Sequence, residues 1–172
     1  MHPSQKATAA FICSLAFVGQ AVSQNQEGAV TPVTETIQVD GHAGFTTYRL
    51  KMDLTEGEAN CYTIFGEGDQ SMVFPAAFHV AAPFGASTGG TNPAFWAIMA
   101  DAQWDSWLTV GMTDASNPGA IASIGIDWAS WTEDAGLTVT DGAVFWMNPD
   151  DAPHVEESVL AQLTLPNTLT EW

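Results

Sequence analysis

Short runs of β-forming residues, separated by turn dipeptides, most constrain the fold of this chain. Gly and Asp in the turns tolerate positive φ or bond their own backbone. Several short strands at this spacing predict an antiparallel β-sandwich or barrel. The expected strands are Val33–Val39, Gly44–Asp53, Asn60–Phe65, Trp107–Met112, Ile121–Trp128, Ala143–Met147 and Ser158–Leu165. We therefore predict an all-β, jelly-roll-like antiparallel sandwich.

Two of these runs alternate in polarity, as half-buried antiparallel strands do. Arg49 and Lys51 share one face of the first run. Tyr48, Leu50 and Met52 share the opposite face of that run. In the second run, Val159–Leu165, one face carries Val159, Ala161, Leu163 and Leu165. Asp141-Gly142, between two further β-rich runs, predicts a two-residue hairpin turn.

The middle of the chain does not follow the strand pattern. Phe74–Ala86 is apolar and interrupted by proline. Asn92 and Pro93 suit the N-cap and first position of a helix over Pro93–Gln103. We expect one short helix, or an irregular excursion, packed across one end of the sandwich.

The N-terminus has the composition of a secretory signal. Lys6 precedes the apolar run Ala7–Val18, and Ala21-Val22-Ser23 offers small residues for cleavage. We expect residues 1–23 to be a signal peptide, 24–30 a flexible arm and 31–172 a single domain of a secreted protein. No later apolar stretch has the length of a membrane span.

Negative charge dominates the chain. It carries 3 basic and 20 acidic residues, for a net charge of −17, yet 46% of it is hydrophobic. Such a chain folds, so the charge lies on a surface that disfavours nucleic acid and anionic lipid as partners. The same surface suits a salty medium, or Ca²⁺, which prefers carboxylate oxygen.

Calcium is the one cofactor that the acidic loops suggest. Candidate ligands are Asp101, Asp105, Asp114, Asp127, Asp150 and Asp151. His42, His79 and His154 are far apart in the sequence, and no zinc-type or EF-hand spacing occurs. Ca²⁺ binding and simple solubility both remain open as explanations of the acidity.

Cys61 is the one cysteine outside the expected signal segment. It lies in a strand-like run, where a thiol packs as a small hydrophobic group. The alternative is an intermolecular disulfide that links a dimer through Cys61. No neighbouring basic residue would lower the pKa of the thiol, so a nucleophilic role is not expected.

Two Trp-X-Ser-Trp segments are the strongest local pattern. Residues three apart in a strand face opposite sides, so one Trp of each pair would enter the core. Core packing and ligand stacking, to a sugar ring or a partner surface, are both open. The candidate ligand-binding residues are Trp104, Trp107, Trp128 and Trp131.

Gly85–Gly89 matches the G-x-S-x-G pattern of serine hydrolases, with Ser87 at its centre. A later Asp and His154 would complete a triad in the right chain order. That motif requires a strand-to-helix turn in a parallel sheet, which the patterns here do not predict. We assign no catalytic residue and expect a protein that is not an enzyme.

The run Asp105–Gly111, with Gly89–Pro93, Gly142–Trp146 and Thr47–Leu50 around it, resembles a secreted β-rich domain of marine bacterial and algal surface proteins. The resemblance covers about Thr46–Leu165. It implies an extracellular β-rich module, often repeated in larger surface proteins, and brings no catalytic residue.

These observations predict a secreted, acidic, non-enzymatic β-sandwich. Its expected role is structural or adhesive, in an extracellular matrix, at a cell surface or on a mineral, with Ca²⁺ as a candidate ligand. The alternative is a carbohydrate-binding module, or a small glycan-active hydrolase, that uses a Trp-lined surface.

Overall fold

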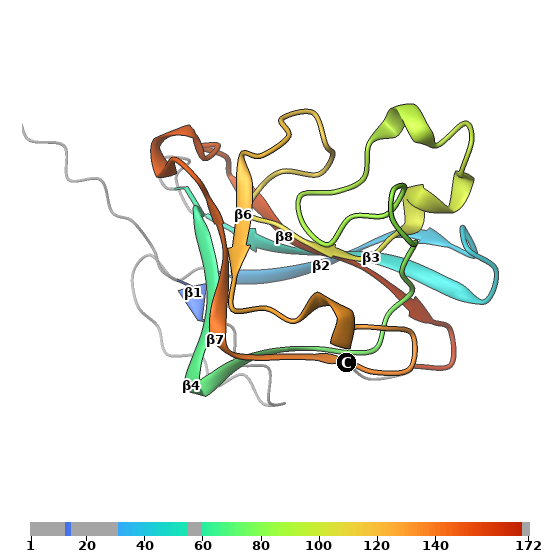
Figure 1. The fold of residues 1–172 in the computed structure, drawn as a ribbon, viewed down its shortest axis with the longest axis horizontal. Helices are drawn as coiled ribbons and strands as arrows, with labels where there is room; N and C mark the ends of the chain where they lie inside the picture. The colour runs from blue at the N-terminus through green and yellow to red at the C-terminus, as the bar shows by residue number, and fades with distance from the viewer. Residues whose placement is uncertain (1–12, 15–30, 55–59, 170–172) are drawn as a thin grey trace, which may run out of the picture.

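The computed structural model describes residues 13–14, 31–54 and 60–169. These residues form two β-sheets that pack face to face (Figure 1). The expected signal segment lies outside the described residues apart from Cys13 and Ser14, and the expected arm 24–30 lies outside them altogether.

Each sheet has four strands. The first sheet has the order β1 (Cys13–Ser14), β4 (Thr63–Phe74), β7 (Leu137–Trp146) and β6 (Ile121–Ile124). The second has the order β2 (Thr31–Val39), β3 (Phe45–Asp53), β8 (Glu157–Pro166) and β5 (Trp107–Leu108). Every pair is antiparallel except β1 with β4. The predicted all-β sandwich is confirmed.

Helical structure in the described residues is limited to short 3-10 turns. These are η1 (Pro93–Phe95), η2 (Ala100–Trp104), η3 (Trp128–Ser130) and η4 (Pro149–Asp151). The described part of the chain therefore contains no helix with the length and apolarity that a membrane crossing needs.

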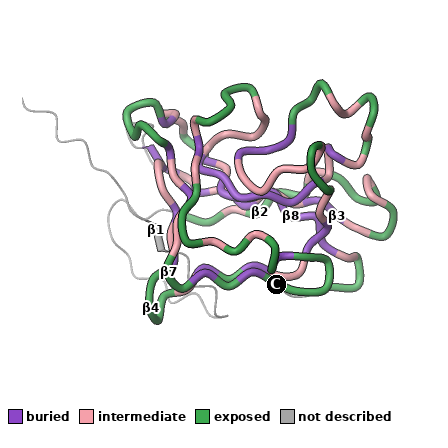
Figure 2. The backbone as a smooth tube through the Cα atoms, in the orientation of Figure 1, coloured by how far each residue is buried: buried purple, intermediate pink, exposed green. Residues whose placement is uncertain are grey.

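The apolar core lies between the two sheets (Figure 2). Leu50 and Met52 are buried there and Tyr48 packs against it, so these three residues share one face as predicted, and that face points to the core. The prediction for β8 is wrong at Val159. A bulge shifts the register between Leu50 and Lys51, which turns Val159 outward and places Leu160 in the core.

The predicted hairpin at Asp141-Gly142 is wrong, because both residues lie within the continuous strand β7. Gly142 pairs with Gly66 of β4, beside a register shift between Glu67 and Met72. A Cβ on Gly66 would come within 2.0 Å of the Val139 carbonyl oxygen. These glycines therefore serve close backbone approach inside a sheet, which is the other common use of strand glycine.

The middle segment, residues 75–106, hydrogen-bonds to β8 next to the part of β8 that pairs with β5. The Phe78 N–H donates to the Thr164 carbonyl (2.9 Å), and the Thr164 N–H donates to Ser106 Oγ (2.9 Å). Asn92 caps η1 as predicted, by accepting from the Ala94 N–H at 2.9 Å. The expected single helix is instead split into η1 and η2.

Candidate ligand-binding cleft

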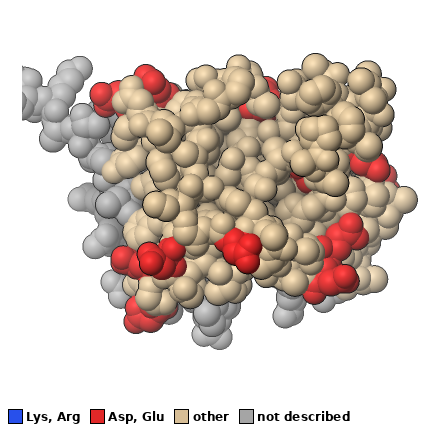
Figure 3. All heavy atoms as spheres, viewed as in Figure 1, with Lys and Arg blue, Asp and Glu red and all other residues tan. Residues whose placement is uncertain are grey.

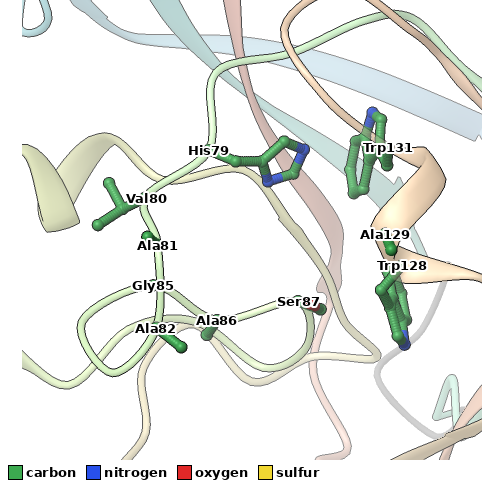
Figure 4. Close-up of a pocket in the computed structure, with 10 residues that line it drawn as sticks. All are labelled: His79, Val80, Ala81, Ala82, Gly85, Ala86, Ser87, Trp128, Ala129 and Trp131. Atoms are coloured by element: carbon green, nitrogen blue, oxygen red, sulfur yellow. The ribbon is translucent and has the colours of Figure 1, made fainter.

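A cleft of about 540 Å³ separates the loop 79–87 from the turn η3 (Figure 4). The His79 imidazole faces Trp131 across it, and the Ser87 side chain points towards Trp128. The full lining is His79, Val80, Ala81, Ala82, Gly85, Ala86, Ser87, Trp128, Ala129 and Trp131. One wall is thus backbone and small side chains, and the other is aromatic.

Asp105 holds the loop wall in place from behind. Its Oδ1 accepts the Val80 N–H (2.8 Å) and its Oδ2 accepts the Ala86 N–H (2.6 Å). The Ser106 N–H bonds to the same carboxylate. Because Asp105 is 1% exposed, these bonds take the place of water and fix both ends of the turn between Val80 and Ala86.

Burial and hydrogen bonding act in opposite directions on Asp105. Desolvation raises the pKa of its carboxyl group from the usual 3.8 to about 6, against the lowering effect of the three N–H donors. Asp105 is therefore an anion at neutral pH, and burial makes this anion less favourable in the folded protein than the protonated carboxyl group would be.

Gly85 permits the tight turn of this loop. A Cβ at this position would lie 1.7 Å from the Val80 carbonyl oxygen and 3.1 Å from Asp105 Oδ2. Gly89 has a φ of +72°, which favours glycine. Both glycines of the G-x-S-x-G pattern are thus explained by backbone geometry.

Ser87 does not occupy a strand-to-helix elbow. Its carbonyl accepts the Leu108 N–H at 3.0 Å, and the Gly89 N–H donates to the Leu108 carbonyl at 2.8 Å, so this segment pairs with β5. His154 bridges to Asn60 and is not among the residues that line the cleft. The geometry therefore does not bring His154 to Ser87, as the triad interpretation would require.

The aromatic wall is built by η3. Asp127 caps the turn by accepting the Ala129 N–H at 3.2 Å. Trp131 is 3% exposed, packs against Phe74 and donates its indole N–H to the Pro75 carbonyl at 2.8 Å. Trp128 is half-buried, with its ring centre 6.4 Å from that of Trp131. Trp131 therefore anchors the wall and Trp128 presents its ring.

His79 joins the two walls. Its ring centre lies 4.6 Å from Trp131 in an edge arrangement, and its Nδ1 is 3.8 Å from Asp105 Oδ1. Burial lowers the pKa of the imidazole, with partial compensation from a hydrogen bond to the Ser106 backbone. The ring is therefore neutral at pH 7, and its buried Nε2 has no hydrogen-bond partner among the described residues.

The four candidate tryptophans do not share one site. Trp107 is 1% exposed, with the Arg49 guanidinium 6.0 Å from its ring centre. Trp104 lies against Gly41, where a Cβ would come within 2.7 Å of the indole. Of the four, only Trp128 and Trp131 line the cleft. They lie at the start and at the C-cap of η3, because β6 ends at Ile124 and does not continue to Trp128 as predicted.

The candidate metal ligands are also dispersed. Asp101 lies 3.5 Å from His42, Asp105 binds backbone N–H groups and Asp127 caps η3. Asp150 and Asp151 form part of η4, and Asp114 accepts the Ser116 N–H. Among the described residues, no three His, Cys, Asp or Glu side chains gather closely enough to hold a metal ion.

Cys61 is buried, at 1% exposed, and its thiol lies 3.7 Å from the Thr63 carbonyl. This position agrees with the prediction of a packed thiol. A disulfide between two chains would require Cys61 to leave the core, so burial argues against the covalent dimer.

The sequence alone does not predict the pairing of His79 with Asp105. The available signal is the position of Asp105 as a lone acid between Trp104 and Trp107, where a buried carboxylate would be expected to find backbone donors. Comparison of the chain with family models, with curated proteins and with solved structures finds no match.

Proposed function

We propose that this protein is a secreted, non-catalytic β-sandwich that adheres to extracellular glycans through the cleft between loop 79–87 and η3. The observation that carries the proposal is the half-buried Trp128 ring beside the anchored Trp131. A tryptophan held on one side by the core and open on the other is typical of binding surfaces.

The indole N–H groups of both tryptophans are already used within the protein. Trp128 donates to Ser123 Oγ at 3.1 Å, and Trp131 donates to the Pro75 carbonyl. A ligand would therefore meet the ring of Trp128 as an apolar face. The C–H face of a sugar ring suits such a platform, because it offers apolar area beside its hydroxyl groups.

The opposite wall supports hydroxyl recognition. Ser87 and the backbone of residues 80–86 line it, and both donate and accept hydrogen bonds. Asp105 makes this wall rigid before any ligand arrives, which reduces the entropy lost on binding. The volume of about 540 Å³ lies in the usual range for small-ligand sites.

Binding to immobilised and soluble β-linked oligosaccharides tests the proposal. We expect Trp128→Ala to abolish retention, because it removes the platform, while the unfolding transition stays cooperative. Trp104→Ala is the matched control, since Trp104 is the first tryptophan of the other Trp-X-Ser-Trp pair and lies outside the cleft. Equal retention of the wild type and Trp128→Ala would refute the proposed site.

A further inference from the structure

The cleft does not end at His79 and Trp131. A second hollow of about 470 Å³ shares His79, Val80, Ala81 and Trp131 with it. The remaining residues that line this hollow are Thr132, Glu133 and Asp134. A ligand seated on Trp128 can therefore extend past Trp131 to two exposed carboxylates.

Neither Lys nor Arg is among the described residues that line the two hollows. Arg49 and Lys51, the Arg and Lys of the described part of the chain, lie in β3 of the second sheet. Lys51 binds Glu35 at 2.6 Å and Glu157 at 3.1 Å. Figure 3 shows acidic side chains and no Lys or Arg on the face that it draws. Among the described residues, neither Lys nor Arg therefore lies in the second hollow beside Glu133 and Asp134.

The interior of the site adds to this negative potential. Asp105 lies behind the loop wall, and the neutral His79 ring in front of it carries no positive charge at pH 7. Aromatic faces attract cations through the negative face of the ring, and most strongly so in tryptophan. Two tryptophans, a neutral imidazole and nearby carboxylates form a setting that favours a cation.

We infer that the ligand of this cleft carries protonated amines, as a glycan built of amino sugars does. The inference rests on the proposed function, whose ligand class it narrows. One sugar ring lies on Trp128, and an ammonium group of the same or the next unit lies beside Trp131 and faces Glu133 and Asp134. Free amines, rather than acetylated ones, are then the recognised feature.

Three oligosaccharides of equal length and linkage test the inference by calorimetry. They are β-1,4-linked oligomers of glucosamine, N-acetylglucosamine and glucose, which differ only at C2 of each unit. At about pH 6.5 and low salt we expect the glucosamine oligomer to bind about fivefold or more tightly than the other two. Raising the ionic strength from about 0.05 M to 0.5 M should shrink this preference.

Charge variants locate the source of the preference. The double variant Glu133→Gln, Asp134→Asn should lose most of it while retaining affinity for the glucose oligomer. The matched control is Glu67→Gln, Asp69→Asn, which removes the same charge from an exposed segment of β4 outside both hollows. A preference that falls equally in both double variants reflects overall charge and overturns the inference.

The outcomes separate the inference from the proposed function. If the acetylated or glucose oligomer binds as tightly as the glucosamine oligomer, through Trp128, the inference is overturned and the glycan site stands. If none of the three binds, the proposed function fails, and the inference with it.

Discussion

Asp105 gives this protein a dependence of stability on pH that is opposite to the usual behaviour of a carboxylate. Its pKa is about 6 in the folded chain, because burial penalises the anion, against a usual value of 3.8. The folded state therefore binds a proton at this group between about pH 4 and 6, where the unfolded state does not. Stability from Asp105 is fully present below pH 3.8 and is lost as the pH rises through about 6.

The size of the effect follows from the difference between the two pKa values. At about 1.4 kcal/mol per pKa unit, the difference corresponds to about 3 kcal/mol, of which about 2.5 kcal/mol is reached by about pH 4. Asp105→Asn removes the titration. We therefore expect the free energy of unfolding of the wild type, relative to Asp105→Asn, to rise by about 2.5 kcal/mol between about pH 7 and pH 4.

Denaturant unfolding at constant ionic strength, followed by tryptophan fluorescence, measures this difference. His79 acts with the opposite sign, since its lowered pKa costs stability as the pH falls below 6.5, and comparison of the two proteins removes most of that contribution. Asp150→Asn, in the exposed turn η4, controls for the loss of one acidic side chain. A difference that stays flat, or that falls with acidification, would show that the three N–H donors outweigh burial and would refute the reasoning.

Three further predictions concern the walls of the cleft and the charge of the chain. Trp131→Ala should destabilise the protein by about 3–5 kcal/mol, because Trp131 is 3% exposed. Trp128→Ala should cost about 1 kcal/mol, because part of its ring is solvated. Thermal unfolding distinguishes the two variants, and equal losses of stability would contradict the roles of Trp131 as anchor and Trp128 as platform. Gly85→Ala should cost about 2 kcal/mol or more, because its Cβ would overlap the Val80 carbonyl. Gly68→Ala, where a Cβ meets nothing within 4 Å despite a positive φ, should cost about 1 kcal/mol, and a larger loss there than at position 85 would count against the close-approach argument. Raising the NaCl concentration from about 0.1 M to 1 M should raise the melting temperature by several degrees, since screening relieves the repulsion within a chain of net charge −17. A melting temperature that does not change with salt would contradict this account of the charge.

Alternation of polarity made the sandwich predictable, because burial on one face of a strand has a period of two residues. Leu50 and Met52 follow that rule. The prediction fails where a bulge changes the period, at Val159, and where glycine serves close packing rather than a turn, at Gly142. Dipeptide signals such as Asp-Gly describe local preference, and pairing with a neighbouring strand overrides it.

The sequence predicts the aromatic wall of the cleft but not the loop wall. The Trp-X-Ser-Trp repeat singles out Trp128 and Trp131, but it does not show that they line a cleft from which Trp104 and Trp107 are absent. His79 and Asp105 meet because loop 79–87 folds back beside β5, and no periodicity in the sequence encodes that return. Long-range contacts of irregular segments are fixed by hydrogen bonds such as those of Asp105, which resemble ordinary loop polarity in a sequence.

The attachment of residues 75–106 to the last strand has a consequence for the cleft. Phe78 and Ser106 bond to Thr164, and the Gln162 amide donates to the Gln103 and Asp105 carbonyls at 3.0 and 2.9 Å. These partners are far apart in sequence, so the segment behind the loop wall is fully hydrogen-bonded only when β8 is in place. The geometry of the cleft therefore depends on the last strand of the domain, although the residues that line it come from the middle of the chain.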